Sequence, residues 1–138
     1  MKKFKTILIV TLILDILQTI PLIMVKMGGE MKDEMIASMG IDGLSDSAPG
    51  ILLLETMMFV FTFIMVGTLV SIFYTLRLKN VESLKTASFL LFISHLFWTM
   101  PDFINLASGS PSHPPILFMV ISLIPVIGLF YVSRKGEL

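Results

Sequence analysis

Residues 4–25 read FKTILIVTLILDILQTIPLIMV, an apolar run in which the charged side chains are Lys5 and Asp15. As a helix, this run is long enough to cross a hydrocarbon core of about 30 Å. Further apolar runs follow at residues 51–76, 84–107 and 115–132, each bounded by charged, Gly-rich or Pro-rich segments. The alternation typical of membrane β-barrel strands is absent. The sequence therefore predicts an all-α polytopic membrane protein with a bundle of four transmembrane helices.

The composition of the chain supports the same class. Of its 138 residues, 55% are hydrophobic and 14% are charged, which is too few charges to coat a soluble domain of this size. The mean hydropathy is +0.92. The charges of the ten basic and ten acidic residues cancel, so the chain has no net positive charge that would favour binding to nucleic acid. We expect a single transmembrane domain over residues 1–138, with the lipid bilayer as its main partner.

The basic start of the chain, Lys2, Lys3 and Lys5, also fits the first part of a signal peptide. The apolar run that follows is too long for such a peptide, contains Asp15, and has no nearby small-x-small cleavage site. We therefore expect the first run to be kept as a membrane helix.

The positions of the basic residues predict the orientation, because Lys and Arg are retained on the cytoplasmic side during insertion. They gather at Lys2, Lys3 and Lys5, at Arg77, Lys79 and Lys85, and at Arg134 and Lys135. On the opposite side, residues 107–114 carry no basic residue, and residues 26–50 carry two lysines against five acids. We expect both termini in the cytoplasm of a cell, N-in and C-in.

Residues 26–50 form the longest polar segment, which we expect to be an outer lid. Met27, Met31, Met35 and Met39 recur at four-residue spacing, and Gly40 is suited to end a helix. This period predicts a short amphipathic outer-loop helix in which methionine serves as adaptable packing. The alternative is a soft-metal site, because thioethers favour Cu(I). No Cys or nearby His supports that alternative, and we predict no metal site.

Several polar residues fall inside the predicted spans, where a carboxylate at the bilayer centre costs about 2.5–3.5 kcal/mol unless it is paired. The candidate ligand-binding residues are Asp15, Gln18, Glu55, His95, Trp98, Asp102 and Asn105. We expect them to face inward. Counting along the helices from the cytoplasmic ends places Asp15 level with His95 near the midplane, where the two side chains could pair. The same count places Glu55 and Asp102 together nearer the outer surface.

Helical spacing arranges these residues on shared faces. His95, Trp98, Asp102 and Asn105 occupy positions i, i+3, i+7 and i+10 of the third span. Pro21 and Pro101 each remove a backbone hydrogen bond in the outer halves of their helices and favour kinks. A pocket that opens outward is therefore expected.

This polar stripe has several interpretations. The side chains can simply fix helix packing, line a site for an amphipathic ligand or a partner subunit, pass protons as part of a proton-coupled transporter, or serve an intramembrane acid–base enzyme. No sequence motif of a known catalytic site is present, so we expect no assigned catalytic residue, and the cofactor is unknown. Gly67 and Ser71 form a small-xxx-small pair that favours a homo-oligomer. The leading interpretation is a binding or accessory protein.

The order of helices and loops resembles the DoxX-like group of small bacterial four-helix membrane proteins. The likeness covers most of the chain, and the segment His95-Leu96-Phe97-Trp98 in the third span is similar locally. The resemblance implies a bacterial inner-membrane protein with an accessory role, linked in some members of the group to quinones. It carries over no functional residue.

Overall fold

The computed structural model describes residues 2–38, 41–110 and 113–136, which form helices and the turns between them. The helices are α1 (Lys2–Met27), α2 (Glu30–Ser38), α3 (Ala48–Thr75), α4 (Val81–Ala107) and α5 (Ile116–Lys135). Within these described ranges, four helices, α1, α3, α4 and α5, are long and apolar enough to cross a membrane. The predicted all-α architecture with four candidate spans is confirmed, and it fits a multi-pass membrane protein.

Polar caps set the starts of α3 and α4, and both helices begin three residues before the apolar runs do. The Ser47 side chain accepts a hydrogen bond from the Gly50 N–H at 3.2 Å at the start of α3. The Asn80 side chain accepts from the N–H groups of Glu82 and Ser83 at 2.8 and 3.3 Å at the start of α4. These bonds satisfy N–H groups that have no partner within the helix, so each first turn forms in polar sequence.

Two glycines account for the end of α1, and two basic residues stabilise the last turn of α5. Gly28 and Gly29 follow α1 with φ of 83° and 85°, a left-handed conformation that residues with a side chain rarely adopt. At the other end of the chain, α5 continues past the predicted residue 132 to Lys135. Arg134 and Lys135 lie in its last turn, where positive charge interacts favourably with the helix dipole.

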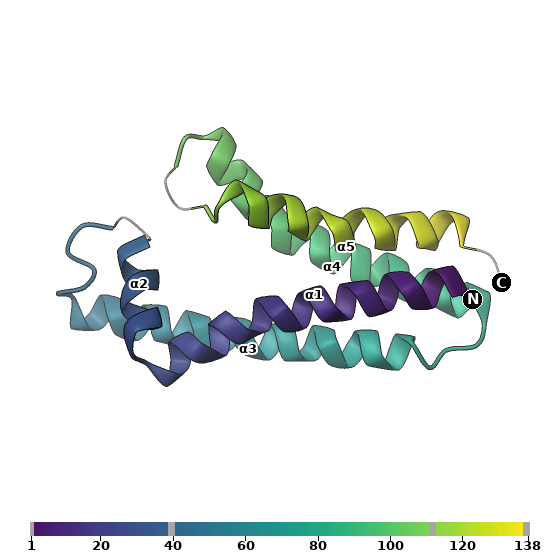
Figure 1. Ribbon diagram of the computed structural model, residues 1–138, viewed down its shortest axis with the longest axis horizontal. Helices are drawn as coiled ribbons and strands as arrows, with labels where there is room; N and C mark the ends of the chain where they lie inside the picture. The colour runs from purple at the N-terminus through teal and green to yellow at the C-terminus, as the bar shows by residue number, and fades with distance from the viewer. Residues whose placement is uncertain (1, 39–40, 111–112, 137–138) are drawn as a thin grey trace.

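The membrane-length helices form two antiparallel hairpins that diverge from one end of the molecule. α1 packs mainly on α3, and α4 packs mainly on α5. The two hairpins meet where the N- and C-termini lie, and they separate toward the end that carries α2 and the connection between α4 and α5 (Figure 1). Space between the hairpins therefore increases along the bundle.

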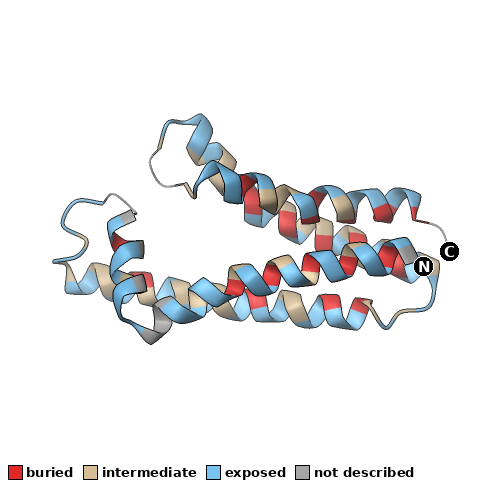
Figure 2. Cartoon of the chain, viewed as in Figure 1, coloured by how far each residue is buried: buried red, intermediate tan, exposed pale blue. Residues whose placement is uncertain are grey.

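Apolar packing is concentrated near the converging end (Figure 2). The buried cluster consists of Phe4, Leu8, Ile72, Leu84, Leu91, Leu129 and Val132, contributed by all four long helices. Close approach of α1 and α5 requires a small residue at Gly128, where an added Cβ would lie 3.0 Å from Ile7 Cγ2. This apolar cluster thus joins the two hairpins near the end of the bundle where the termini lie.

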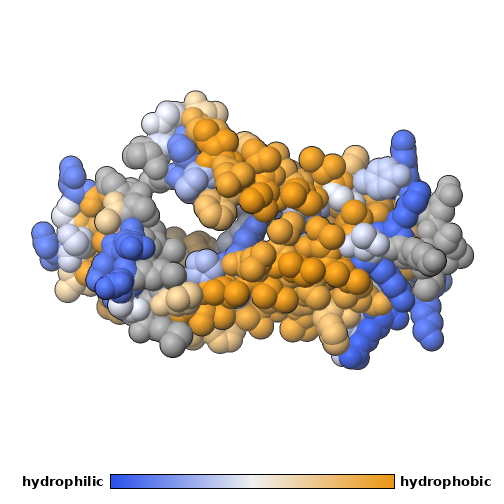
Figure 3. Space-filling view, viewed as in Figure 1, coloured by the Kyte–Doolittle hydropathy of each residue, from blue (hydrophilic) through white to orange (hydrophobic). Residues whose placement is uncertain are grey.

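The surface along the long helices is strongly apolar. Figure 3 shows a broad hydrophobic band over the middle of the molecule, with hydrophilic residues gathered at both ends. Large apolar side chains of the long helices, such as Ile13, Phe63 and Ile127, are exposed at 51%, 64% and 64%. Such a surface is typical of helices that contact lipid.

Helix α2 lies beside the ends of α1 and α3, and Lys32 on α2 forms an ion pair with Glu55 on α3. The predicted methionine face cannot be placed on this helix. The side chains of Met27, Met31 and Met35, and the whole of Met39 and Gly40, lie outside the described residues.

Candidate functional site in the bundle interior

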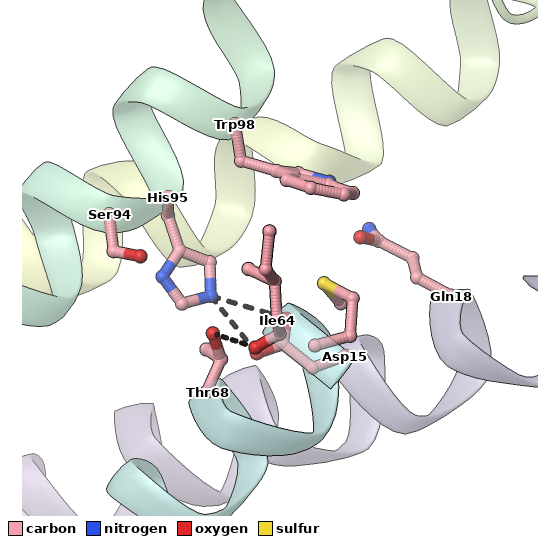
Figure 4. A pocket seen from close by; sticks show the side chains of 8 residues that line it. Asp15, Gln18, Ile64, Thr68, Ser94, His95 and Trp98 are labelled. Atoms are coloured by element: carbon pink, nitrogen blue, oxygen red, sulfur yellow. Dashed lines mark hydrogen bonds and ion pairs between the residues drawn. The ribbon is translucent and has the colours of Figure 1, made fainter. Parts of the chain in front are cut away.

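Asp15 on α1 and His95 on α4 form a buried pair that joins the two hairpins (Figure 4). His95 Nε2 lies 3.0 Å from Asp15 Oδ2 and 3.2 Å from Oδ1. Asp15 is 1% exposed and His95 is 9% exposed. His95 lies one helical turn beyond Leu91 of the core cluster. The pairing predicted from equal helical depth is therefore present.

The hydrogen bonds of His95 define the charge of the pair. His95 Nδ1 lies 2.7 Å from the Leu91 carbonyl oxygen, which can only accept, so Nδ1 carries a proton and donates it. Nε2 then shares one proton with Asp15, held either as Nε2–H or on the carboxyl group. Both forms are neutral overall, which avoids burying an isolated charge. The pair therefore holds one exchangeable proton between two buried groups.

A small central cavity adjoins this pair. Its volume is ≈ 20 Å³, enough for a single water molecule. The lining residues are Asp15, Gln18, Ile64, Met65, Thr68, Ser94, His95 and Trp98. Figure 4 shows the side chains of Gln18, Thr68 and Trp98 arranged around the Asp15–His95 pair. The central cavity therefore brings groups that bind or transfer protons to one place.

A large cavity of ≈ 370 Å³ lies between α1, α4 and α5 on the diverging side of the bundle. Its walls are mainly apolar, and the lining residues are Leu14, Leu17, Gln18, Pro21, Trp98, Thr99, Asp102, Pro114, Phe118, Ile121 and Ser122. Asp102 supplies a carboxylate, and His113 in the adjacent connection lies within electrostatic range of it. A mainly apolar cavity with a few polar groups is the usual form of a small-molecule site.

Trp98 connects the two cavities and lines both of them, as does Gln18. The indole ring of Trp98 packs edge-on against Phe61 of α3, with ring centroids 5.4 Å apart. The central cavity is thus lined by four residues of the predicted polar set, Asp15, Gln18, His95 and Trp98. Asp102 lines the neighbouring large cavity.

Glu55 and Asn105 take a different position from the rest of the predicted set. Neither residue lines the central or the large cavity. Glu55 pairs with Lys32 of α2, and Asn105 lies near the end of α4, where its carbonyl accepts from the Ser110 N–H at 3.0 Å. The sequence placed Glu55 together with Asp102 from their depth alone, whereas Glu55 pairs with Lys32 of α2.

Sequence reasoning did not identify several residues that contribute to these spaces. Thr68 and Ser94 line the central cavity, and Phe118 and Ser122 of α5 line the large one. Thr68 lies at helical spacing from Ser71, a signal that could have marked it. The apolar wall residues carry no such signal, because an aliphatic side chain facing a cavity and one facing lipid look alike in the sequence.

Metal-binding groups were also compared within the described ranges. No cluster of three or more His, Asp or Glu side chains there could hold a metal ion. The Asp15–His95 pair supplies two such groups.

Comparison with known proteins adds no family assignment. No protein-family model matches the chain, and no significant match was found among curated proteins or solved structures. The four long apolar helices fit a multi-pass helical membrane protein.

Proposed function

We propose that the protein binds an amphipathic ligand in the large cavity and acts as a binding or accessory protein in the membrane. The observation that carries this proposal is the ≈ 370 Å³ cavity itself, whose wall is apolar apart from a few polar groups. Leu14, Leu17 and Phe118 would contact the apolar body of the ligand. Asp102 would accept hydrogen bonds from a cationic or donor headgroup.

The proposed orientation has both termini in the cytoplasm and α2 on the outer side, so that the large cavity opens outward. The charge distribution supports it, as does the position of both termini at one end of the bundle (Figure 1). Cysteine labelling tests it, because the chain has no cysteine of its own. Ser108→Cys should react with an impermeant thiol reagent on intact cells, and Lys135→Cys only after permeabilisation. The reverse pattern would refute the orientation.

Membership of the DoxX-like group, in a bacterial inner membrane, is part of the same proposal. It rests on the order of helices and loops and on the segment His95-Leu96-Phe97-Trp98. An accessory role beside a partner subunit would agree with the resemblance.

Ligand binding can be measured through Trp98, the single tryptophan of the chain, which lines the large cavity. A brominated alkylamine and a brominated fatty acid of equal chain length serve as quenching probes for the protein in detergent micelles. The amine should quench saturably and bind about tenfold more tightly, since a charge-assisted hydrogen bond contributes about 1.5–3 kcal/mol. Asp102→Asn should remove this preference.

Two further variants separate cavity binding from partition into the micelle. Ser122→Leu places bulk in the cavity and should weaken the binding of both probes. Thr56→Leu, at an exposed position of α3 outside the cavity, should leave both unchanged. Quenching that rises linearly with either probe, equally in all variants, would overturn the proposal.

A further inference from the structure

The central cavity shares lining residues with two larger spaces. Gln18 and Trp98 line it and the large cavity alike. On its other side, Ile64, Thr68 and Ser94 line both it and a groove of ≈ 450 Å³ between α3 and α4. The Asp15–His95 pair thus lies at the junction between the large cavity and this α3–α4 groove.

The groove carries a row of hydroxyl groups along α3. Thr68, Ser71 and Thr75 share one helical face. Each hydroxyl donates to the carbonyl four residues earlier, at distances of 3.0, 2.8 and 2.8 Å respectively. A hydroxyl that donates in this way still has lone pairs with which to accept from water. The groove therefore offers hydrogen-bond acceptors about one turn apart.

Together, the three spaces are lined by residues from nearly the whole length of the bundle. At one end, the large cavity reaches Pro114 in the connection between α4 and α5. At the other end, the groove reaches Thr75, the last residue of α3. The Asp15–His95 pair lines the smallest of the three spaces, the central cavity of ≈ 20 Å³, which has room for one water.

We propose that the protein conducts protons across the membrane, with the Asp15–His95 pair as the relay between the large cavity and the α3–α4 groove. A hydronium ion in the central cavity gives one proton to the neutral pair and becomes water. The pair then holds two exchangeable protons, with one protonated carboxyl group and one imidazolium. It returns to its neutral form by giving a proton to a water beside Thr68 and Ser94. One proton enters and one leaves, so no redox partner is needed.

The surroundings of the pair favour rapid release of the second proton. The walls of the central cavity carry no charged side chain other than the pair itself: α3 contributes Ile64, Met65 and Thr68, and α4 contributes Ser94 and Trp98. A net positive charge in such an apolar site has high energy. On the large-cavity side, Asp102 lies within electrostatic range of His113. Asp102 would pass protons to water molecules beside Gln18 and Trp98.

This proposal is independent of ligand binding, because it needs the linked spaces and the pair but no ligand. It is tested on the full chain in liposomes that contain a pH-sensitive dye, with valinomycin to balance charge after a step in external pH. Wild-type protein should collapse the pH gradient faster than liposomes without protein. Asp15→Asn should slow the protein-dependent flux about 100-fold, the lower part of the range that a positioned acid–base group contributes.

Ser94→Leu tests the path without touching the pair. Ser94 is exposed at the junction of the central cavity with the groove, so a larger side chain there should fold and should block the flux. Thr86→Leu, also exposed on α4 but outside these spaces, is the matched control and should conduct as the wild type does. If wild-type liposomes are no faster than empty ones, the proposal is overturned. Equal flux in Ser94→Leu and the control would overturn it as well, even if Asp15→Asn did not fold.

Discussion

Replacement of Asp15 by Leu should destabilise the bundle, because it leaves the buried Nε2 of His95 without its partner. Loss of one partner of a buried ion pair costs about 3–5 kcal/mol in soluble proteins, whereas hydrogen bonds between membrane helices average about 0.6 kcal/mol, with a maximum near 1.7. Asp15 and His95 are 1% and 9% exposed, and the cavity beside them has room for one water, so water would replace the lost bond only in part. We therefore expect a loss of about 2–3 kcal/mol, between these two ranges.

The pair can be isolated with a double-mutant cycle. His95→Leu should cost a similar amount, while the Asp15→Leu/His95→Leu double variant buries two apolar groups and should lose no more than either single variant. The resulting coupling energy is about 2 kcal/mol. Asp15→Asn supplies an amide N–H that donates to the unprotonated Nε2 of neutral His95, so it should lose only about 1 kcal/mol.

Unfolding in mixed micelles by added dodecyl sulfate, followed by far-ultraviolet circular dichroism, measures each free energy. The signal comes from the helices and does not depend on Trp98, which lies beside the pair. If the losses of the two single variants simply added in the double variant, the two side chains would not be coupled. The description of Asp15 and His95 as one buried unit would then be wrong.

Two further predictions concern the ends of the bundle. Gly128→Leu should lower the free energy of unfolding by about 1–3 kcal/mol, because its Cβ would crowd Ile7. Gly67→Leu is the control: a Cβ there has nothing within 4 Å, so the change should be less than about 0.5 kcal/mol. Equal effects of the two variants in dodecyl sulfate titrations would contradict the packing of α1 on α5. Glu55→Gln should release α2 from α3, which would appear as faster hydrogen exchange over residues 30–38. The free energy of global unfolding should change by less than about 1 kcal/mol, because the Lys32 and Glu55 side chains are both part-exposed. Unchanged exchange would show that the ion pair does not hold α2.

The hydropathy of the sequence predicts the four long helices, but it does not predict the residues at which these helices begin and end. Apolar runs of membrane-spanning length predicted all four long helices. The starts of α3 and α4 depend on single capping side chains, Ser47 and Asn80, that lie in polar segments where hydropathy gives no signal. Hydropathy finds the part of a helix that lipid can cover, and capping decides how far the helix continues beyond it.

The sequence predicted at which level along the helices the polar residues lie, but not which neighbouring helix each side chain faces. Counting residues along the helices correctly placed Asp15 level with His95, because both helices rise by the same amount per residue. The same count could not find the Lys32–Glu55 pair, since it gives no information on which neighbour a side chain faces. The cavities were harder still, because they arise from the divergence of the two hairpins (Figure 1).

The proposed binding site requires that water and solutes can reach the large cavity between the long helices. Reaction of Ser122→Cys with a small impermeant thiol reagent tests it most directly, because thiols react as thiolates and need access to water. Ile127→Cys, on the same helix but 64% exposed on the apolar surface, is the matched control. The account predicts that the cysteine at 122 reacts from the outer side and is protected by the alkylamine, while the cysteine at 127 stays unreacted. Two equally unreactive cysteines would contradict it.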